Sequence, residues 1–416
     1  MATSFNSTTG SAFLQKKYSK GFIANAISSK ASKALAMIPK VVLDSGDTYN
    51  YLTLVDEGNV GYSASFAVGQ ATASNSTNSV GSQFAMPFME DVQIWRVSGK
   101  ILAQTRNNSA AWVNALKFSV DSALRIAAYR KSIALYTQGW GELGVLAGVS
   151  GFTFKFADAA HIYRILRGAP VVFSSTLNTA TLRSGTAINV TKVDYTSNVV
   201  TCDTALATPG GVNGDYVFIS GDRQNSATPA RLRPVGFPVH IPVQPVTDAT
   251  ISTLFGVDRS ANSRNYGNYQ DATTMSPVDG LITLVQTCES VGNATELVAF
   301  VSPAMFTTIS KQLGTERRYV EVKGEGIAGF KTIEIFADGI SCALMSDKYL
   351  DTLVGFVFDR KAFEWVSLGT APHIVNDDNN SLLRTSDDNG VEGRVASYEN
   401  LACKNPAACG QIAFAS

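Results

Sequence analysis

The stretch that decides the fold is SAAWVNALKFSVDSALRIAAYRKSIALYTQ, from Ser109 to Gln138. It contains neither Gly nor Pro, and its apolar residues recur at helical spacing. Asn107, Asn108 and Ser109 offer capping oxygens for its first turn, and Gly139 follows its end. We therefore predict a single helix over 109–138, roughly 45 Å long, whereas the mean helix has about 11–12 residues.

This predicted helix has only a narrow polar line, formed by Lys117, Asp121 and Arg125 at i, i+4 spacing. A helix with so little polar surface is covered over most of its circumference. Two architectures explain it: a flat, extended molecule spanned by one helix, or an α/β enzyme with a long core helix.

Composition narrows the class of protein. A chain of 416 residues indicates two or three domains. Charged residues make up 16%, against about 25% in ordinary domains, which is typical of a surface covered by neighbours or of a Ser/Thr/Asn/Gly-rich β protein. Lys+Arg and Asp+Glu both number 34, which excludes a global basic signature for nucleic acid.

Targeting signals are lacking in the sequence. No apolar run reaches 18 residues, so no transmembrane helix is predicted. The N-terminal residues contain no apolar signal-peptide core, which indicates synthesis in the cytosol. The five cysteines are scattered and odd in number, which predicts reduced thiols. Pairing of Cys403 with Cys409 is the minor alternative.

Residues 1–43 form a tail-like segment with six lysines and no acid before Asp44. We interpret it as an arm that lies on a neighbouring subunit or faces nucleic acid, with a solvated flexible terminus as the alternative. Its lysines are Lys16, Lys17, Lys20, Lys30, Lys33 and Lys40.

Residues 44–104 predict two strands, Asp47–Val55 and Asp91–Thr105, around a long Gly/Ser/Ala/Asn-rich stretch. That composition cannot build its own core. It predicts either a disordered loop or a long β-hairpin that packs on a partner, and long insertions of this kind are usually functional.

After the predicted helix, we expect a turn-rich link over residues 139–151. The sequence of residues 159–242 then predicts a small β unit inserted in the main domain. Thr186–Asp194 and Asn198–Asp203 flank a turn at Thr196–Asn198, and Gly214–Gly221 is a further strand.

From about Thr247 onward, the sequence predicts a section of mixed helices and strands. Ser276 and Pro277 start one helix that Gly292 closes, and Ser302-Pro303 start a second that ends near Gly314. Consecutive strands with short turns predict antiparallel pairing. The strands are Leu297–Val301, Tyr319–Lys323, Lys331–Ala337, Ser341–Met345, Val354–Asp359, Phe363–Leu368 and a last strand, Gly390–Asn400.

The residues that could form a catalytic, nucleotide or metal site do not have the neighbouring elements or ligands that such sites require. Gly139, Gly141 and Gly144 follow a helix, and Gly324, Gly326 and Gly329 precede a strand, whereas a dinucleotide site needs a strand before and a helix after. His161, His240 and His373 fall in three separate sections and are expected to be structural. Cys403-x5-Cys409 lacks a second ligand pair for zinc.

Other charged candidates are expected to be ordinary surface. Arg317 and Arg318 are interpreted as surface or subunit contacts. A set of acids near the C-terminus misses the calcium-loop spacing and is interpreted as a solvated loop; these are Asp377, Asp378, Asp387, Asp388 and Glu392. We therefore expect no catalytic, cofactor-binding or metal residue, and no enzyme.

The order of a basic arm, a long Gly/Ser-rich β loop, a strand, one long helix and a mixed α/β domain resembles the major capsid protein of tailed bacteriophages, the HK97-like fold. Thr253–Asn262 (TLFGVDRSAN) is similar to a G-x-D-R stretch of that family. The resemblance covers 1–157 and 245–410. The lysine–asparagine cross-linking motif of some members cannot be mapped here, and the short arm predicts no cleaved scaffolding segment.

The resemblance implies an α+β fold with five parts: an N-terminal arm (1–43), an E-loop with flanking strands (44–104), a spine helix with P-domain (105–157), a β-rich insertion domain (158–243), and an A-domain with the remaining P-domain strands (244–416). The E-loop itself would be Asp56–Trp95.

The resemblance also implies a function: a structural coat protein of the virion that self-assembles, in the host cytoplasm, into hexamers and pentamers of an icosahedral shell around double-stranded DNA. Implied partners are further copies of the chain, portal, scaffolding and possibly decoration proteins, and DNA bound non-specifically on the inner face, with no membrane and no cofactor. The alternatives are an encapsulin-like nanocompartment shell and an α/β enzyme with an unrecognised site.

Overall fold

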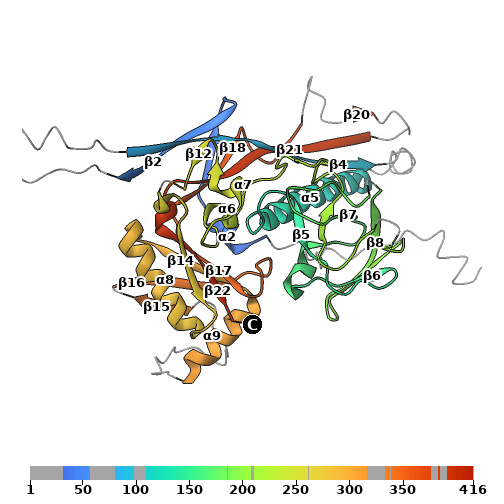
Figure 1. Cartoon of the computed structure of the whole chain (residues 1–416). Helices are drawn as coiled ribbons and strands as arrows, with labels where there is room; N and C mark the ends of the chain where they lie inside the picture. The colour runs from blue at the N-terminus through green and yellow to red at the C-terminus, as the bar shows by residue number, and fades with distance from the viewer. Residues whose placement is uncertain are drawn as a thin grey trace, which may run out of the picture.

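The structure is a computed structural model that describes residues 31–56, 80–97, 109–184, 186–207, 210–260, 262–315, 333–337, 339–375, 383–384 and 391–415. Within these ranges, three six-stranded sheets surround one long helix (Figure 1). An elongated sheet runs along one side of the molecule, and the other two sheets lie beneath it at either side of the helix. We call the elongated one the platform sheet.

The long helix is α5, Ser109–Ala134, which begins where the sequence predicts and ends four residues before Gln138. Beyond Ala134 the chain tightens, because Tyr136 N–H donates to Ile133 and Thr137 N–H donates to Ala134. The free carbonyls of Leu135 and Thr137 then accept from the backbone of 236–237. A distant segment therefore supplies the helix end, which local spacing could not predict.

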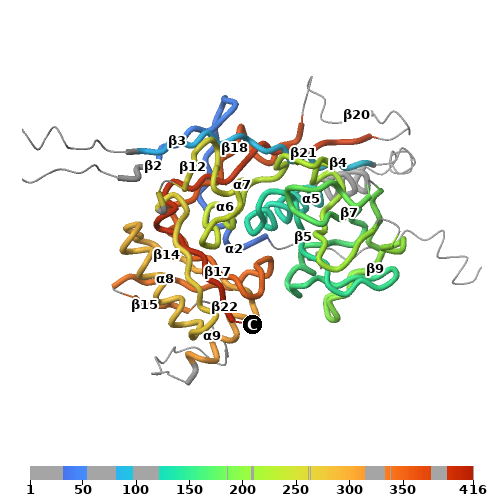
Figure 2. Tube along the Cα trace, in the orientation of Figure 1, coloured from blue at the N-terminus to red at the C-terminus, as the bar shows by residue number. Residues whose placement is uncertain are grey.

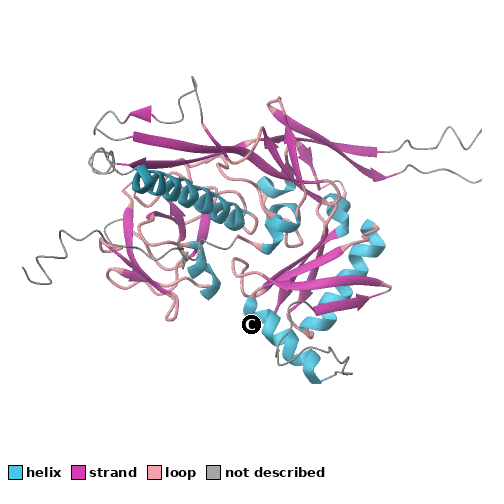
Figure 3. Ribbon diagram, turned by 180° about the vertical axis from the view of Figure 1, so that it is seen from behind, coloured by secondary structure: helices cyan, strands magenta, loops and turns pink. Residues whose placement is uncertain are grey.

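The platform sheet is built on β21, which pairs with β4 along one edge and with β18 along the other. Figure 2 shows β4 and β21, from opposite ends of the chain, lying side by side. From behind, α5 runs beneath these long strands (Figure 3), and Trp95, Ala123 and Val395 pack between them. Its strands are β1 Lys40–Leu43, β4 Met89–Val97, β18 Phe363–Leu368, β19 His373–Ile374, β20 Leu383–Arg384 and β21 Val391–Cys403.

Part of the predicted arm is built into the core, so the tail-like interpretation is wrong for 31–43. Helix α2, Lys33–Met37, places Ala34 in the central apolar cluster, and β1 pairs in parallel with β18. Ser32 N–H donates to Ser132 Oγ of α5 at 2.8 Å, and its hydroxyl donates to Asp347. Residues 1–30 lie outside the described residues.

The second sheet carries two helices on one face, α8 Pro277–Gly292 and α9 Pro303–Thr315. The prediction of α8 is confirmed: Ser276 caps it through Asp279 N–H at 3.1 Å, and Asn293 in the left-handed region follows Gly292. In sheet order the strands are β13 Asn268–Ala272, β22 Cys409–Phe414, β17 Val354–Asp359, β14 Leu297–Val301, β16 Ile340–Ser346 and β15 Ile333–Ala337.

Two predictions about this region are wrong. The strand predicted at 390–400 is present as β21, but it is not the last one. The last strand is β22, which lies inside the second sheet between β13 and β17. Consecutive strands are not all paired: β15 and β16 are antiparallel neighbours, but β17 and β18 belong to different sheets. The predicted strand 319–323 lies outside the described residues.

The third sheet is the small β sheet, which has an apolar core of its own. It starts at β5, directly after α5, so the link predicted over 139–151 contains its first strand. Asn198, at φ 55°, forms the predicted hairpin turn. Its elements are β5 Glu142–Val145, β6 Thr153–Phe154, the 3₁₀ turn η2 Ala159–Arg164, β7 Pro170–Ser174, β8 Ile188–Asp194, β9 Val199–Cys202 and β10 Tyr216–Ile219.

After this sheet the chain returns to the centre of the molecule, where Phe237 and Ile241 are fully buried against Phe358 and Phe363. The returning segment contains α6 Phe237–His240, α7 Ala249–Ser252, the hairpin of β11 Thr253–Leu254 and β12 Val257–Asp258, and η3 Ser263–Asn265; η4 Pro406–Ala408 joins β21 to β22.

Strands β2 Thr48–Asp56 and β3 Val80–Pro87 form a two-stranded antiparallel ribbon that projects from the platform (Figure 1). The paired strands confirm a hairpin for their own residues, but its buried face packs on the platform of the same chain, so the expectation that it packs only on a partner is wrong for these residues. Residues 57–79 lie outside the described residues. Where described, no helix is long and apolar enough to cross a membrane.

Candidate functional site

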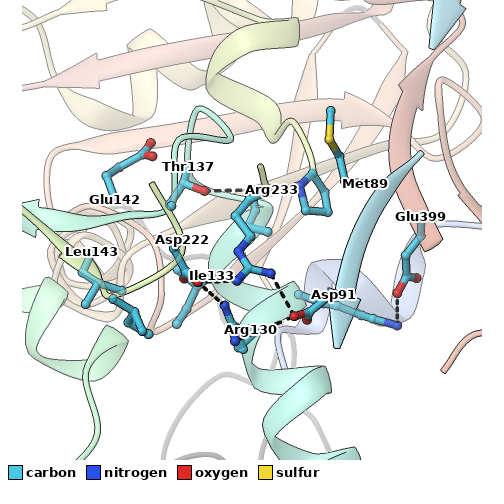
Figure 4. Close-up of a pocket in the computed structure, with 15 residues that line it drawn as sticks. Met89, Asp91, Arg130, Ile133, Thr137, Glu142, Leu143, Asp222, Arg233 and Glu399 are labelled. Atoms are coloured by element: carbon cyan, nitrogen blue, oxygen red, sulfur yellow. Dashed lines mark hydrogen bonds and ion pairs between the residues drawn. The ribbon is translucent and has the colours of Figure 1, made fainter. Parts of the chain in front are cut away.

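Four charged side chains form a closed ring where α5, β4 and the segment after β10 meet (Figure 4). Arg233 donates to Asp91 at 2.8 Å and also contacts Asp222. Arg130 contacts Asp222 at 2.6 Å and lies 3.7 Å from Asp91. We call this arrangement the ion ring. Its side chains are at most 20% exposed, and its two positive and two negative charges cancel.

Local structure explains how these charges come together. Asp91 and Trp95 lie on the face of β4 that covers α5, and Arg130 lies near the end of that helix. Burial alone would lower the pKa of Arg233, but Asp222 and Asp91 outweigh burial and raise it. The guanidinium therefore stays charged, and the ring joins the platform sheet to the segment that leaves the small β sheet.

A neighbouring ion pair extends this contact. Lys131, next to Arg130 on α5, contacts Glu399 of β21, and the second oxygen of Glu399 accepts from Trp365 Nε1. Lys131 is the residue that interrupts the predicted apolar stripe. The interruption marks the place where the helix meets buried carboxylates of the platform sheet.

A second cluster joins η2 to the loop before β17. Asp351 accepts from His161 Nε2 at 2.8 Å and from Arg164, and Arg164 also donates to Tyr349 O at 2.7 Å. Asp158 accepts from Thr352 N at 2.6 Å. Burial raises the pKa of Asp351, but Arg164 and His161 outweigh this effect and hold it well below its usual range.

The atoms of Asp158, His161 and Asp351 lie within 4.8 Å of one another, which is the spacing of a metal site. Arg164 already supplies a cation to Asp351, however, and Asp158 is occupied by Thr352 and Ala160 N–H. The two carboxylates of this donor set are therefore paired within the protein, whereas His161 Nδ1 has no hydrogen-bond partner among the described residues.

The three histidines are not brought together. His161 belongs to the cluster above. His240 is buried in the central core and donates to Leu401 O at 3.0 Å, and His373 on β19 contacts Thr370 O. Each has a structural contact within the fold.

The other sequence candidates are also accounted for where they are described. Glu392 is buried in β21, where it pairs with Arg96 and Arg394, so the solvated-loop interpretation is wrong for this residue. Gly139 and Gly141 lie in turns with positive φ. The five cysteines are free and buried. Several candidates lie outside the described residues: Gly324, Gly326, Gly329, Arg317, Arg318, Asp377, Asp378, Asp387 and Asp388.

The TLFGVDRSAN stretch forms the β11–β12 hairpin, with Phe255 and Gly256 in the left-handed region at its turn. Arg259 then turns inward and is 1% exposed, stacked 4.8 Å from the centre of the Tyr266 ring. In the described part of the chain, its guanidinium donates hydrogen bonds to the backbone carbonyls of Val239, His240, Ile251 and Asn265.

The β2–β3 ribbon has one buried and one exposed face. Tyr51 and Phe84 are paired across the strands, stack at 5.0 Å and are buried against the platform. On the opposite face Leu52 is 68% exposed.

Comparison with solved structures shows which proteins share this architecture. The capsid asymmetric unit of cyanophage A-1(L) is similar over 98% of this chain and 99% of its own, at 12% identity and a TM-score of 0.56. The capsid of a native GTA particle is similar over 99% of this chain and 100% of its own, at 10% identity and a TM-score of 0.52. The chain has a phage capsid fold.

No protein-family model and no curated protein matches the sequence. The capsid fold is therefore recognised from the arrangement of elements, since about one residue in ten is shared. The sequence analysis did not predict the ion ring of this chain. Its only signals were Arg130-Lys131 in an otherwise apolar stretch and Asp91 at the start of a predicted strand.

Proposed function

We propose that this chain is the coat protein of a tailed-phage virion, and that it assembles into hexamers and pentamers of an icosahedral shell around double-stranded DNA. The observation that carries the proposal is the match of nearly the whole of both chains to two capsid structures at TM-scores of 0.56 and 0.52. A structural role without catalysis agrees with these neighbours.

In this proposal each part of the fold has a shell role. The β2–β3 ribbon is the base of the E-loop, α5 is the spine helix, and the platform strands belong to the P-domain. The sheet covered by α8 and α9 is the A-domain, and the small β sheet is the insertion domain. Residues 1–30 are the remainder of the arm.

The exposed face of the ribbon supports a contact with another copy of the chain. Leu52 is exposed although the strand residues on either side of it are buried, and many weak contacts of this kind add up over a shell. Interfaces that repeat head to tail close into rings when the rotation closes. Portal, scaffolding and decoration proteins, and DNA on the inner face, are further proposed partners, with assembly in the host cytoplasm.

Negative-stain electron microscopy of the full chain, with size-exclusion chromatography, tests the proposal. Hollow particles, rings or sheets of capsomers are expected, alone or with a scaffolding partner. Particles that copurify with an enzyme cargo instead of DNA would identify a nanocompartment shell. A compact dimer that never assembles, with or without scaffold, would contradict the shell function.

Deletion of Asn59–Gly81 tests the E-loop assignment separately. We expect a soluble, folded subunit that does not form shells, since in this proposal the deleted segment lies on a neighbouring subunit. Normal shells from the first deletion would rule out the assignment.

A further inference from the structure

A cavity of about 450 Å³ lies between the small β sheet, the Pro-rich segment 238–251 and the ends of β17 and β22. One wall is apolar and consists of Pro242, Val243, Pro245, Leu350 and Val354. Val243 is 51% exposed at this wall, so the apolar surface is open to the outside of the subunit. A cavity of this size and lining can receive a few bulky apolar side chains.

The N-terminal arm enters the described structure next to this cavity. Ser32 Oγ lies 3.4 Å from the hydroxyl oxygen of Tyr136, a residue that lines the cavity. Ser32 also donates to Asp347, and Leu350, three residues further along the same loop, belongs to the apolar wall. Helix α2, which begins at Lys33, lies close to the centre of the molecule (Figure 1). Residues 1–30 are therefore attached to the fold at the edge of the cavity.

The part of the arm that precedes this attachment point is apolar. Phe22, Ile23 and Ile27 are three large apolar side chains within six residues. Segments that stay solvated are poor in such side chains, because a large apolar surface is stabilised only when it is buried. The five steps of the chain from Ile27 to Ser32 span at most roughly 18 Å. Ile27 therefore has to lie within that distance of the cavity edge.

Charge complementarity supports the same pairing of arm and cavity. Residues 1–30 contain four lysines and no acid. The described residues that line the cavity carry three carboxylates and one guanidinium, that of Arg164. Among the carboxylates, the side chain of Asp351 is 40% exposed. A basic arm is therefore attracted to the rim of this cavity, although salt screens an attraction between exposed charges.

The covalent connection favours the cavity of the same chain over that of another copy. A short flexible connection holds a segment near its site at an effective concentration on the order of millimolar. Contacts from a few apolar side chains then suffice for docking, whereas an arm from another copy also loses translational freedom.

We propose that the apolar segment 22–27 of the arm docks in this cavity of its own chain, with Phe22, Ile23 and Ile27 against the wall around Val243 and Leu350. The lysines on either side of the segment remain at the rim, in water. The proposal does not depend on the shell function, since it concerns a single chain. The competing occupants are ordered water and the same segment of a neighbouring copy.

A pair of engineered cysteines tests the docking in the full chain. Ile23→Cys with Val243→Cys places one thiol on the arm and one on the exposed part of the wall, and the five native cysteines are buried. Diamide is the oxidant, and it takes up the two hydrogens that are released when two thiols form a disulfide. We expect a disulfide within one chain. It is detected as a monomer of altered mobility on a non-reducing gel and as a linked peptide pair by mass spectrometry.

Two matched variants separate docking from chance collision. Phe22→Ser with Ile27→Ser, added to the same cysteine pair, keeps the connection but removes the apolar side chains that would hold the segment. We expect this variant to cross-link at least about tenfold more slowly, because each buried apolar side chain favours the docked state. Ile23→Cys with Phe152→Cys is the position control, because Phe152 is 53% exposed but does not line the cavity. This pair should also cross-link slowly.

Two outcomes would overturn the proposal. An unchanged rate without Phe22 and Ile27, or equal rates at Val243 and Phe152, would mean that the arm collides with the surface at random and that water fills the cavity. Disulfide-linked dimers in place of the product within one chain would mean that the cavity receives the arm of a neighbouring copy.

Discussion

Arg233 Nη1 lies 2.8 Å from Asp91 Oδ1, although the two residues are 142 positions apart in the chain. This contact ties the segment that leaves the small β sheet to β4 of the platform sheet. Because Asp222 and Arg130 complete the ion ring, removal of one member leaves the others buried with a net charge.

Asp91→Asn is therefore expected to lower the free energy of unfolding by about 3 kcal/mol, the typical cost of breaking a buried ion pair from one side. Denaturant titration monitored by circular dichroism measures this change. Lys361→Ala is the control, because Lys361 is 71% exposed in its pair with Glu296 and such pairs contribute at most about 1 kcal/mol. Equal effects of the two changes would show that the ring is screened like a surface pair.

His240 is expected to make the fold sensitive to acid. Burial, with the nearby charge of Arg259, lowers its pKa from 6.5 to about 3. Below pH 6.5 the unfolded chain binds a proton at this residue that the folded chain does not bind, so stability falls as the pH is lowered toward 3, by up to about 1.4 kcal/mol per pH unit.

His240→Gln keeps a donor for Leu401 O but cannot titrate. Urea unfolding at pH 7, 5.5 and 4.5 should show a shallower loss of stability in this variant than in the wild type. Parallel curves for the two proteins would mean that His240 is not the group that titrates.

Arg259 is expected to be essential for the central fold. Burial lowers its pKa to about 10, so it remains charged at neutral pH. Its planar fork reaches carbonyls of three chain segments, which a lysine ammonium cannot match. Arg259→Lys should cost about 3 kcal/mol of unfolding free energy, since buried carbonyls lose their donors. Arg264→Lys, at an exposed position in η3, is the control, and a loss no larger than in this control would contradict the assigned role.

Elements with local signals were predictable from the sequence. Helix α8 has a serine cap, a proline in its first turn and apolar residues at helical spacing, and all three act within the helix. Strands β14, β17 and β18 were also predicted at their observed bounds, because each is a short apolar run between turns.

Elements defined by distant partners were not predictable. Strand β22 contains Gly410 and Gln411 and is central only because β13 and β17 pair with it from far along the chain. Asp91 and Arg233 look like surface charges until the fold joins them. The ion ring is a consequence of tertiary packing, and the charges that interrupt the apolar stretch at Arg130-Lys131 do not say which distant carboxylates they meet.

Leu52 and Tyr51 provide a test that separates assembly from folding. They are adjacent on β2, but Leu52 is 68% exposed whereas Tyr51 is 5% exposed and stacked on Phe84. Leu52→Ser removes apolar surface from the face proposed to contact another subunit, so its unfolding free energy should change by less than about 0.5 kcal/mol while the yield of shells falls severalfold.

Tyr51→Ser should lower the unfolding free energy by about 3 kcal/mol, because it empties a buried aromatic site. Chromatographic shell yield and denaturant unfolding, measured on the same preparations, give both quantities. If Leu52→Ser forms shells as well as the wild type does, the exposed face of the ribbon is not part of the subunit interface.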